Sequence, residues 1–389
     1  MVSRLLLLVI YLAFISLGLP DSLLGPAWPT MYKQLSVPIH YAGIIFMIIA
    51  AGTVISSLFS ARFIKRLGVA SITTFSVLAT ALALLGFSYS QHFIFLCLLA
   101  IPLGLGAGCV DAAVNNYVAL HYEARHMNWL HCFWGVGAAI GPLIMSNYLA
   151  HGQSWTMGYR TVGLIQLLLV LILFISFPLW TKNKKKQTAE NKAETKVSFK
   201  TLLAIPGLKQ ALIVFFCYCT IEATFGLWGA SYLVFIRKFS PESAARLVSF
   251  FYIGITLGRF LSGFVTVSLN NRQMVYMGQF VILLGLIVLL FPFQVTLLPG
   301  YFLVGLGCAP VFPSLLHETP RNFGEEYSQA IMGLQMASAY IGITVMPWLF
   351  GQLSSYLGYS FFIWFIGFVF IVKFYMNYSL NKIVLKSRI

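Results

Sequence analysis

The chain has 389 residues, of which 59% are hydrophobic and 9% charged, and its formal net charge is +15. A mean hydropathy of +0.86 excludes an ordinary soluble domain and predicts an all-α membrane protein. The positive charge does not indicate a nucleic-acid partner. Most basic residues fall in short segments between apolar stretches, where they act as topology signals.

The apolar stretches are long enough for about twelve helices across a hydrocarbon core of ~30 Å. They cover approximately residues 5–32, 41–63, 69–90, 93–120, 127–150, 157–180, 209–236, 245–268, 272–291, 294–316, 328–352 and 358–377. A lysine-rich polar segment divides them into six and six. We therefore predict an N-terminal half at 1–180, a basic cytoplasmic linker at 181–208 and a C-terminal half at 209–389.

The basic residues are unevenly divided between the two sides of the predicted membrane. With both termini in the cytoplasm, eighteen Lys and Arg residues lie on the inner side and five on the outer side. Such an excess is typical of the cytoplasmic side of multi-pass proteins. We expect a monomer in the cell membrane (the inner membrane in bacteria), surrounded by lipid, with both ends inside.

An internal repeat relates the two halves. Three pairs of spans share residues at a single offset of 201 positions. The matches are Gly104, Gly106 and Val110 with Gly305, Gly307 and Val311; Ala138, Ile140 and Gly141 with Ala339, Ile341 and Gly342; and Asp21 and Gly25 with Glu222 and Gly226. The repeat predicts two six-helix halves related by a pseudo-two-fold axis along the membrane normal, with the substrate held between them near mid-membrane.

The first span combines an acid with three prolines. Pro20, Pro26 and Pro29 each remove a backbone N–H group, so a broken helix is expected. Broken helices at membrane depth are found where they are packed by protein or line a wet cavity. Asp21 lies in this stretch, and we interpret it as a substrate or proton site. The alternative is a structural carboxylate that caps the freed backbone amides.

The fourth span carries the second deep acid. Asp111 and Asn115 are four residues apart and share one helical face. An acid beside an amide suits the binding of hydroxyl groups or a proton relay, and an interhelical hydrogen bond is the alternative. The residue equivalent to Asp111 in the second half is Phe312, so the predicted proton-coupling acid belongs to the N-terminal half alone.

Three further side chains near these acids are candidates for the site. His131 in the fifth span could share protons with Asp111, because histidine titrates close to physiological pH, or it could be a packed hydrogen-bonding group. Trp134 and Trp228 offer flat faces on which a sugar ring can stack, although a tryptophan inside a bundle also serves packing.

Glu222 is the third deep acid, and it has two interpretations. It forms a structural ion pair with Arg259, the basic residue near the middle of the eighth span, or it takes part in transport. Three glutamines within the spans either line a cavity with polar groups or serve packing; they are Gln166, Gln279 and Gln335. The sequence contains no phosphate-binding loop, no nucleophile–base set and no metal-ligand spacing, so neither an enzyme nor a metal site is expected.

Four motifs together resemble a known transporter family. The twelve spans, duplicated halves and basic linker resemble the major facilitator superfamily. Within it, the chain is similar to the fucose:proton symporter family of sugar permeases over essentially its whole length. The similar segments are 19–25, 108–115 with Asn128 downstream, 258–263 and 305–313.

The resemblance implies that the acids at Asp21 and Asp111 serve sugar binding and proton coupling, and it places Asn128 among the candidate substrate residues. A glutamine and an asparagine of the family's fifth helix align with His131 and Trp134 here, which departs from the pattern expected for fucose itself.

We therefore predict a secondary transporter that imports a sugar or related polyol with a proton by alternating access. Asp111 and His131 are the expected coupling groups, and the expected substrate site contains Asp21, Asn115, Asn128, Trp134, Glu222 and Trp228. No cofactor is expected, and Na⁺ remains an open choice as coupling ion. The alternatives are proton-driven efflux of an amphipathic drug or lipid-like compound, and a membrane sensor that binds ligand without transport.

Overall fold

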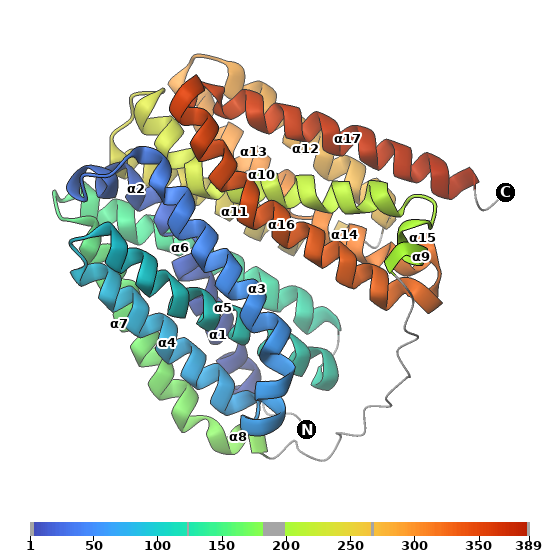
Figure 1. The fold of residues 1–389 in the computed structure, drawn as a ribbon, viewed down its shortest axis with the longest axis horizontal. Helices are drawn as coiled ribbons and strands as arrows, with labels where there is room; N and C mark the ends of the chain where they lie inside the picture. Colours follow the sequence, from blue (N-terminus) through green and yellow to red (C-terminus); the bar gives the residue numbers. More distant parts are fainter. Residues whose placement is uncertain (1–3, 123, 182–198, 266–267, 387–389) are drawn as a thin grey trace.

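The structure is a computed structural model that describes residues 4–122, 124–181, 199–265 and 268–386. These residues form helices, turns and loops, and no strand occurs among them. Twelve helical stretches in this part of the chain are long and apolar enough to cross a membrane. The predicted all-α architecture is confirmed, and the helices lie in two groups that follow the two halves of the sequence (Figure 1).

The N-terminal half is built from helices α1 to α8. Their bounds are α1 Arg4–Asp21, α2 Leu24–Gln34, α3 Ala42–Leu67, α4 Val69–Tyr89, α5 Phe93–His121, α6 Ala124–Ala150, α7 Trp155–Ile175 and α8 Phe177–Thr181, with the 3₁₀ turn η1 Ile39–Tyr41 before α3. The first two helices form one broken span. The bundle is held by extensive contacts of α3 with α5, α4 with α5 and α7, and α1 with α6.

The C-terminal half is built from helices α9 to α17. Their bounds are α9 Phe199–Leu203, α10 Leu208–Phe235, α11 Pro241–Val265, α12 Asn271–Leu290, α13 Leu297–Cys308, α14 Val311–His317, α15 Thr319–Phe323, α16 Glu325–Leu357 and α17 Phe362–Lys386, with 3₁₀ turns η3 Gln294–Thr296 and η4 Tyr359–Phe361. The end of the predicted linker is therefore helical, whereas residues 182–198 lie outside the described residues.

Two spans are interrupted, one in each half, at positions that are not equivalent. The expected break in the first span is present, because α1 ends at Asp21 and α2 begins at Leu24. In the C-terminal half the equivalent helix α10 is continuous, and the break lies instead in the tenth span, between Cys308 and Val311. The sequence did not predict this second break.

The glycines of the repeat make equivalent contacts in the two halves. A Cβ on Gly104 would overlap the carbonyl oxygen of Ile49, and one on Gly305 would overlap that of Phe251. The contacts join α5 to α3 and α13 to α11, which are matching pairs of spans. Because these backbones touch, only glycine fits at both sites, and the pseudo-symmetry is built into the packing.

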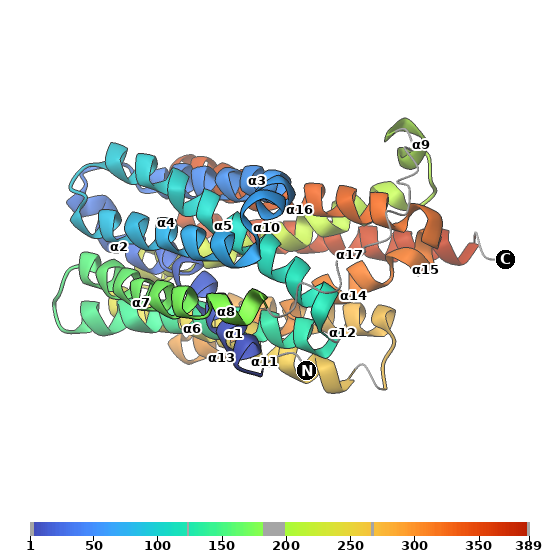
Figure 2. The same cartoon turned by 90° about the horizontal axis from the view of Figure 1, so that it is seen from below.

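The two halves meet most closely at the end of the molecule away from the chain termini. There α2 packs on α10 and α11, and the Cβ position of Gly25 falls on the backbone oxygen of Gly226. Helices α6 and α11 run antiparallel along each other, and Ser146 at the outer end of α6 donates a 2.8 Å hydrogen bond to the Glu242 carbonyl. Figure 2 shows the two groups of helices from below.

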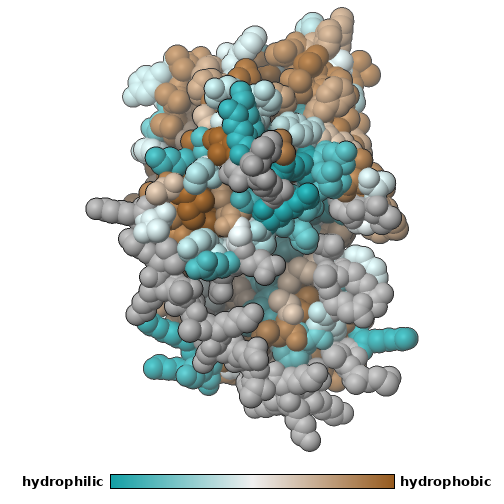
Figure 3. Space-filling model, turned by 90° about the vertical axis from the view of Figure 1, so that its right-hand side faces the viewer, coloured by the Kyte–Doolittle hydropathy of each residue, from teal (hydrophilic) through white to brown (hydrophobic). Residues whose placement is uncertain are grey.

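Contacts between the halves show which end is closed. Beyond Asp21 and Glu222, on the side away from the termini, α2 packs on α10 and α11, and Gly43 of α3 meets the backbone of Trp348 in α16. Asp21 itself is exposed and Glu222 is partly exposed, although both lie half-way through the bundle. Because the far end is closed, solvent reaches them from the end that carries the termini. Figure 3 looks onto this end, where hydrophilic side chains gather over the C-terminal half.

Candidate functional site

Asp21 is positioned by the break in the first span. Pro26 has no N–H group to bond the Ser22 carbonyl, and the chain turns between α1 and α2. Ser22 is buried, and its hydroxyl donates to the carbonyls of Gly18 at 3.3 Å and Leu19 at 3.2 Å. The backbone is thus satisfied locally, which leaves the Asp21 carboxylate free to point into the space between the halves.

Trp134 holds this carboxylate from the neighbouring helix. Its indole Nε1 donates a 2.9 Å hydrogen bond to Oδ2 of Asp21. Helix α6 lies very close to α1, because the Cβ position of Gly18 falls on the Trp134 carbonyl and that of Gly137 on the Ile15 carbonyl. The two glycines therefore fix the distance across which Trp134 and Asp21 interact.

Arg259 of α11 joins the two halves at this point. Its guanidinium lies 4.9 Å from the centre of the Trp134 ring, and Nη1 donates to the His131 carbonyl at 3.4 Å. On its own half, Nη2 lies 3.9 Å from Oε1 of Glu222, which is the ion pair expected from the sequence. Both side chains of the pair are about one-fifth exposed, at 18% and 20%.

Tyr218 completes this arrangement in the C-terminal half. Its hydroxyl donates a 2.5 Å hydrogen bond to Oε2 of Glu222, one helical turn away on α10. The two oxygens of Glu222 are therefore divided between Tyr218 and Arg259. A continuous series of polar contacts runs from Asp21 through Trp134 and Arg259 to Glu222, and it crosses the interface between the halves.

Asp111 and Asn115 form the second polar group of the N-terminal half. Asn115 donates a 2.9 Å hydrogen bond from Nδ2 to Oδ1 of Asp111, as their spacing on α5 suggests, and both are partly exposed. Asp111 is close enough to Asp21 for their charges to interact. From the opposite half, Tyr340 of α16 also lies within the electrostatic reach of Asp111.

His131 occupies a different environment from the one expected. Its ring packs edge-on against Phe14, with 5.9 Å between ring centres, and its carbonyl takes the hydrogen bond from Arg259. Within the described part of the chain no hydrogen bond joins its ring to Asp111. In this conformation His131 is thus a neighbour of the cross-half contact and not a direct relay partner of Asp111.

Trp228 lies away from the exposed acids. It is 0% exposed, and its Nε1 donates a 2.7 Å hydrogen bond to the Pro347 carbonyl within the C-terminal half. It also packs edge-on against Phe350, with ring centres 5.8 Å apart. The structure therefore gives Trp228 a packing environment in this conformation. The side chain of Asn128 lies outside the described residues.

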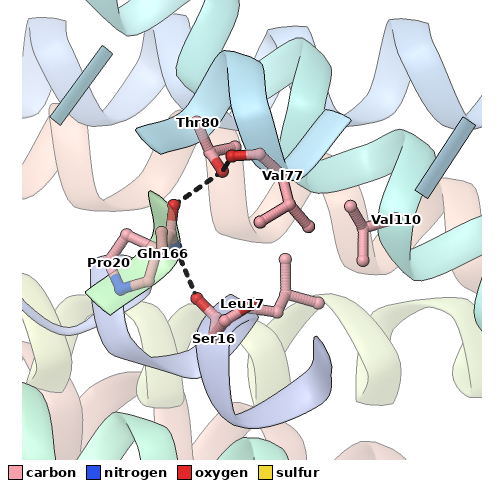
Figure 4. A pocket seen from close by; sticks show the side chains of 7 residues that line it. All are labelled: Ser16, Leu17, Pro20, Val77, Thr80, Val110 and Gln166. Atoms are coloured by element: carbon pink, nitrogen blue, oxygen red, sulfur yellow. Dashed lines mark hydrogen bonds between the residues drawn. The ribbon is translucent and has the colours of Figure 1, made fainter. Parts of the chain in front are cut away.

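The three glutamines are buried polar residues that form hydrogen bonds within the helix bundle. Gln166 is buried, donates to the Ser16 carbonyl at 2.7 Å and accepts from Thr80 at 2.8 Å (Figure 4). The cavity beside it measures about 10 Å³ and has room for no more than about one water molecule. Gln279 and Gln335 are buried as well and accept hydrogen bonds from Asn377 and Thr319.

Sequence reasoning missed two members of the site. Tyr218 lies four residues before Glu222, so the helical spacing could have identified it as a partner. Tyr252, whose ring packs edge-on against Trp134 at 6.4 Å, follows only from the packing of α6 on α11. No group of three or more His, Cys, Asp or Glu side chains suited to a metal ion occurs among the described residues.

Two pseudo-symmetric six-helix halves, closed at one end and with the exposed Asp21 between them, define a multi-pass membrane transporter for a small molecule and not an enzyme. The chain belongs to the Major Facilitator Superfamily, whose family model matches residues 10–334. The predicted superfamily is confirmed.

Individual relatives agree with this membership. The chain is 24% identical to the glucose/mannose transporter GlcP of Bacillus subtilis (strain 168), over 88% of this chain and 86% of that protein. In fold it is similar to a bacterial homologue of the human lysosomal transporter Spinster in an inward-facing, unoccupied conformation (TM-score 0.76, 13% identity, 97% of each chain). It is also similar to a mutant of the nucleoside transporter NupG (TM-score 0.73, 14% identity, 98% and 100% of the chains).

Proposed function

We propose that this transporter imports a hexose or a related polyol together with a proton, by alternating access, across the cell membrane with both termini in the cytoplasm. The main observation behind this proposal is the exposed Asp21 carboxylate near Asp111. It lies half-way through a bundle that opens toward the chain termini. The relative named as a glucose/mannose transporter supports sugar as the substrate class.

The substrate contacts would centre on Asp21 and Trp134. The carboxylate accepts and the indole N–H donates, so a sugar hydroxyl can exchange with their 2.9 Å hydrogen bond without leaving either group unsatisfied. The Trp134 ring is partly exposed beside Arg259, and its exposed part would pack against the apolar side of a sugar ring.

Asp111 would carry the proton. The Asn115 amide that donates to its carboxylate is a neutral partner, so the pair can take up and release a proton without breaking a salt bridge. A protonated Asp111 also removes one of two interacting negative charges from the space between the halves. That change favours closure of the cavity around the bound sugar, and release of the proton to the cytoplasm favours opening.

The test is a measurement of external pH around lightly buffered, de-energised vesicles that contain the protein, during addition of a panel of hexoses. We expect one hexose to cause alkalinisation with the wild type and no signal with Asp111→Asn. Glu242→Gln is the matched control, because it makes the same change from acid to amide near the outer end of α11.

Three results would overturn the proposal. Alkalinisation by Asp111→Asn at the wild-type rate would remove Asp111 from coupling, and uptake that stops when Na⁺ is replaced by choline would replace the proton by Na⁺. Silence across the panel, together with higher sensitivity of deletion cells to amphipathic toxins, would identify an efflux transporter instead.

A further inference from the structure

A groove separate from the candidate site lies on the C-terminal half, between α12 and α17. Its volume is about 330 Å³. The lining residues are Arg272, Tyr276, Tyr378, Asn381, Lys382 and Leu385. They come from the first turns of α12 and the last turns of α17, so the groove lies at the end of the molecule that carries the C-terminus (Figure 1). None of the lining residues is acidic.

The length of α17 places this groove at the membrane surface. Its 25 residues extend about 37 Å at ~1.5 Å per residue, which exceeds a hydrocarbon core of ~30 Å. The last turns therefore reach the level of the lipid headgroups. Tyr378 and Leu385 are exposed on this stretch, and tyrosine is enriched at the boundary between hydrocarbon and water.

Two cations face this groove, and one of them is held rigidly. Arg272 donates from Nη2 to Oδ1 of Asn322 at 3.0 Å, and its Nε lies 3.4 Å from Oε2 of the buried Glu318. Glu318 offsets part of this charge but also lies 3.6 Å from Arg321, so the neighbourhood stays positive. Lys382 is exposed at the groove.

Neutral donors lie between these cations. Asn381 donates a 3.2 Å hydrogen bond to the Tyr276 hydroxyl, which orients both polar groups in the groove. Two cations, an amide and two phenols match a phosphate group, and the exposed Phe374 and Ile371, one and two turns nearer mid-membrane on the same face of α17, match its acyl chains. Basic pockets between membrane helices on one face bind such headgroups.

We propose that this groove binds the phosphate headgroup of an anionic phospholipid, with the acyl chains lying along the exposed Phe374 and Ile371 on the membrane side of Tyr378. The proposal does not depend on which substrate the protein transports. The membrane supplies the ligand at high local concentration, whereas a free phosphate ion would gain nothing from the apolar side chains of Phe374 and Ile371.

Native mass spectrometry of the full-length protein in detergent, titrated with dioleoylphosphatidylglycerol, tests the proposal directly. We expect one phosphatidylglycerol to bind with preference over phosphatidylcholine. Lys382→Gln should weaken this binding about fivefold, the contribution of one basic side chain near an anionic surface. Lys209→Gln is the control, because it removes the same charge from an exposed position at the same end of the C-terminal half, outside the groove.

Three outcomes would overturn the proposal. Equal binding of phosphatidylcholine would show that the headgroup charge is not recognised. An equal loss in Lys209→Gln would assign the effect to overall charge. Displacement of the lipid by millimolar inorganic phosphate would make free phosphate the ligand. Each readout is a bound mass, so none depends on sugar transport.

Discussion

The two halves of this transporter share a framework but differ in chemistry. Gly104 and Gly305 place their helices against neighbouring backbones in the same way. Yet the position of Asp111 in the first half is occupied by Phe312 in the second, which packs against the rings of Phe215 at 5.4 Å and Tyr218 at 5.9 Å. Where one half offers a carboxyl to the central space, the other fills the position with aromatic packing.

Under the proposed function, this difference gives the two halves different roles. The N-terminal half supplies the exposed Asp21 and the Asp111–Asn115 pair, which are the groups suited to bind a substrate and a proton. The C-terminal half supplies Arg259, whose guanidinium reaches across to Trp134. The two halves thus share glycine packing positions but differ in their polar residues.

We expect the largest effect from a variant that removes the contact between the halves. Arg259→Gln leaves Glu222 without its cation and Trp134 without the guanidinium over its ring. Because the pair is mostly buried, we expect the transition state for transport to lose about 2 kcal/mol of stabilisation. This loss lowers the initial rate of sugar uptake about 30-fold. The measurement is uptake of radiolabelled sugar by vesicles.

The double variant Arg259→Gln with Glu222→Gln separates charge from contact. If the unpaired Glu222 carboxylate causes the defect, the second substitution should recover part of the rate. No recovery, with normal protein levels, would show that Arg259 acts through Trp134 and His131 and not through the ion pair.

A pair of tryptophan variants sharpens the comparison between the halves. Trp134→Phe keeps a ring but loses the N–H that donates to Asp21, so we expect a KM about tenfold higher at nearly unchanged maximal rate. Trp228→Phe loses an equivalent hydrogen bond within the C-terminal half, to Pro347, and should lower the melting temperature while KM stays constant. Concentration series of uptake and thermal unfolding distinguish the two. A raised KM in both variants would place Trp228 in the substrate site after all.

Two glycine variants test the shared framework through stability, with the smallest expected effect on the chemistry of transport. Gly104→Ala and Gly305→Ala each force a methyl group against a carbonyl oxygen, on Ile49 and Phe251 respectively. Overpacking of this kind costs about 1–3 kcal/mol, so both variants should melt several degrees below the wild type and by similar amounts. Fluorescence-detected thermal unfolding provides the measurement. A large loss in one variant alone would contradict equivalent packing of the two halves.

Much of the fold could be predicted from sequence patterns that do not depend on tertiary contacts. Hydropathy predicts the twelve spans because each helix must satisfy its own backbone in lipid. The break at Asp21 follows from the prolines around it. The second break, before Val311, was missed because proline alone does not end a membrane helix. Pro102, Pro142 and Pro347 all lie inside continuous helices.

The site was only partly predictable, for a different reason. Asp21, Asp111 and Glu222 stand out because acids are costly at membrane depth, and the spacing of Asp111 and Asn115 places them on one face. The direction in which Trp134 points depends on how α6 packs against α1, and the reach of Arg259 depends on how the halves meet. Neither arrangement is encoded in local spacing.

The central claim is that Asp111 couples the proton and that no acid of the second half replaces it. Sugar exchange across vesicles, with no net proton movement, should therefore continue in Asp111→Asn at close to the wild-type rate and lose its dependence on pH. Uphill accumulation driven by an imposed proton gradient should be absent in the same variant. Accumulation that persists in Asp111→Asn, with pH-dependent exchange intact, would contradict the claim.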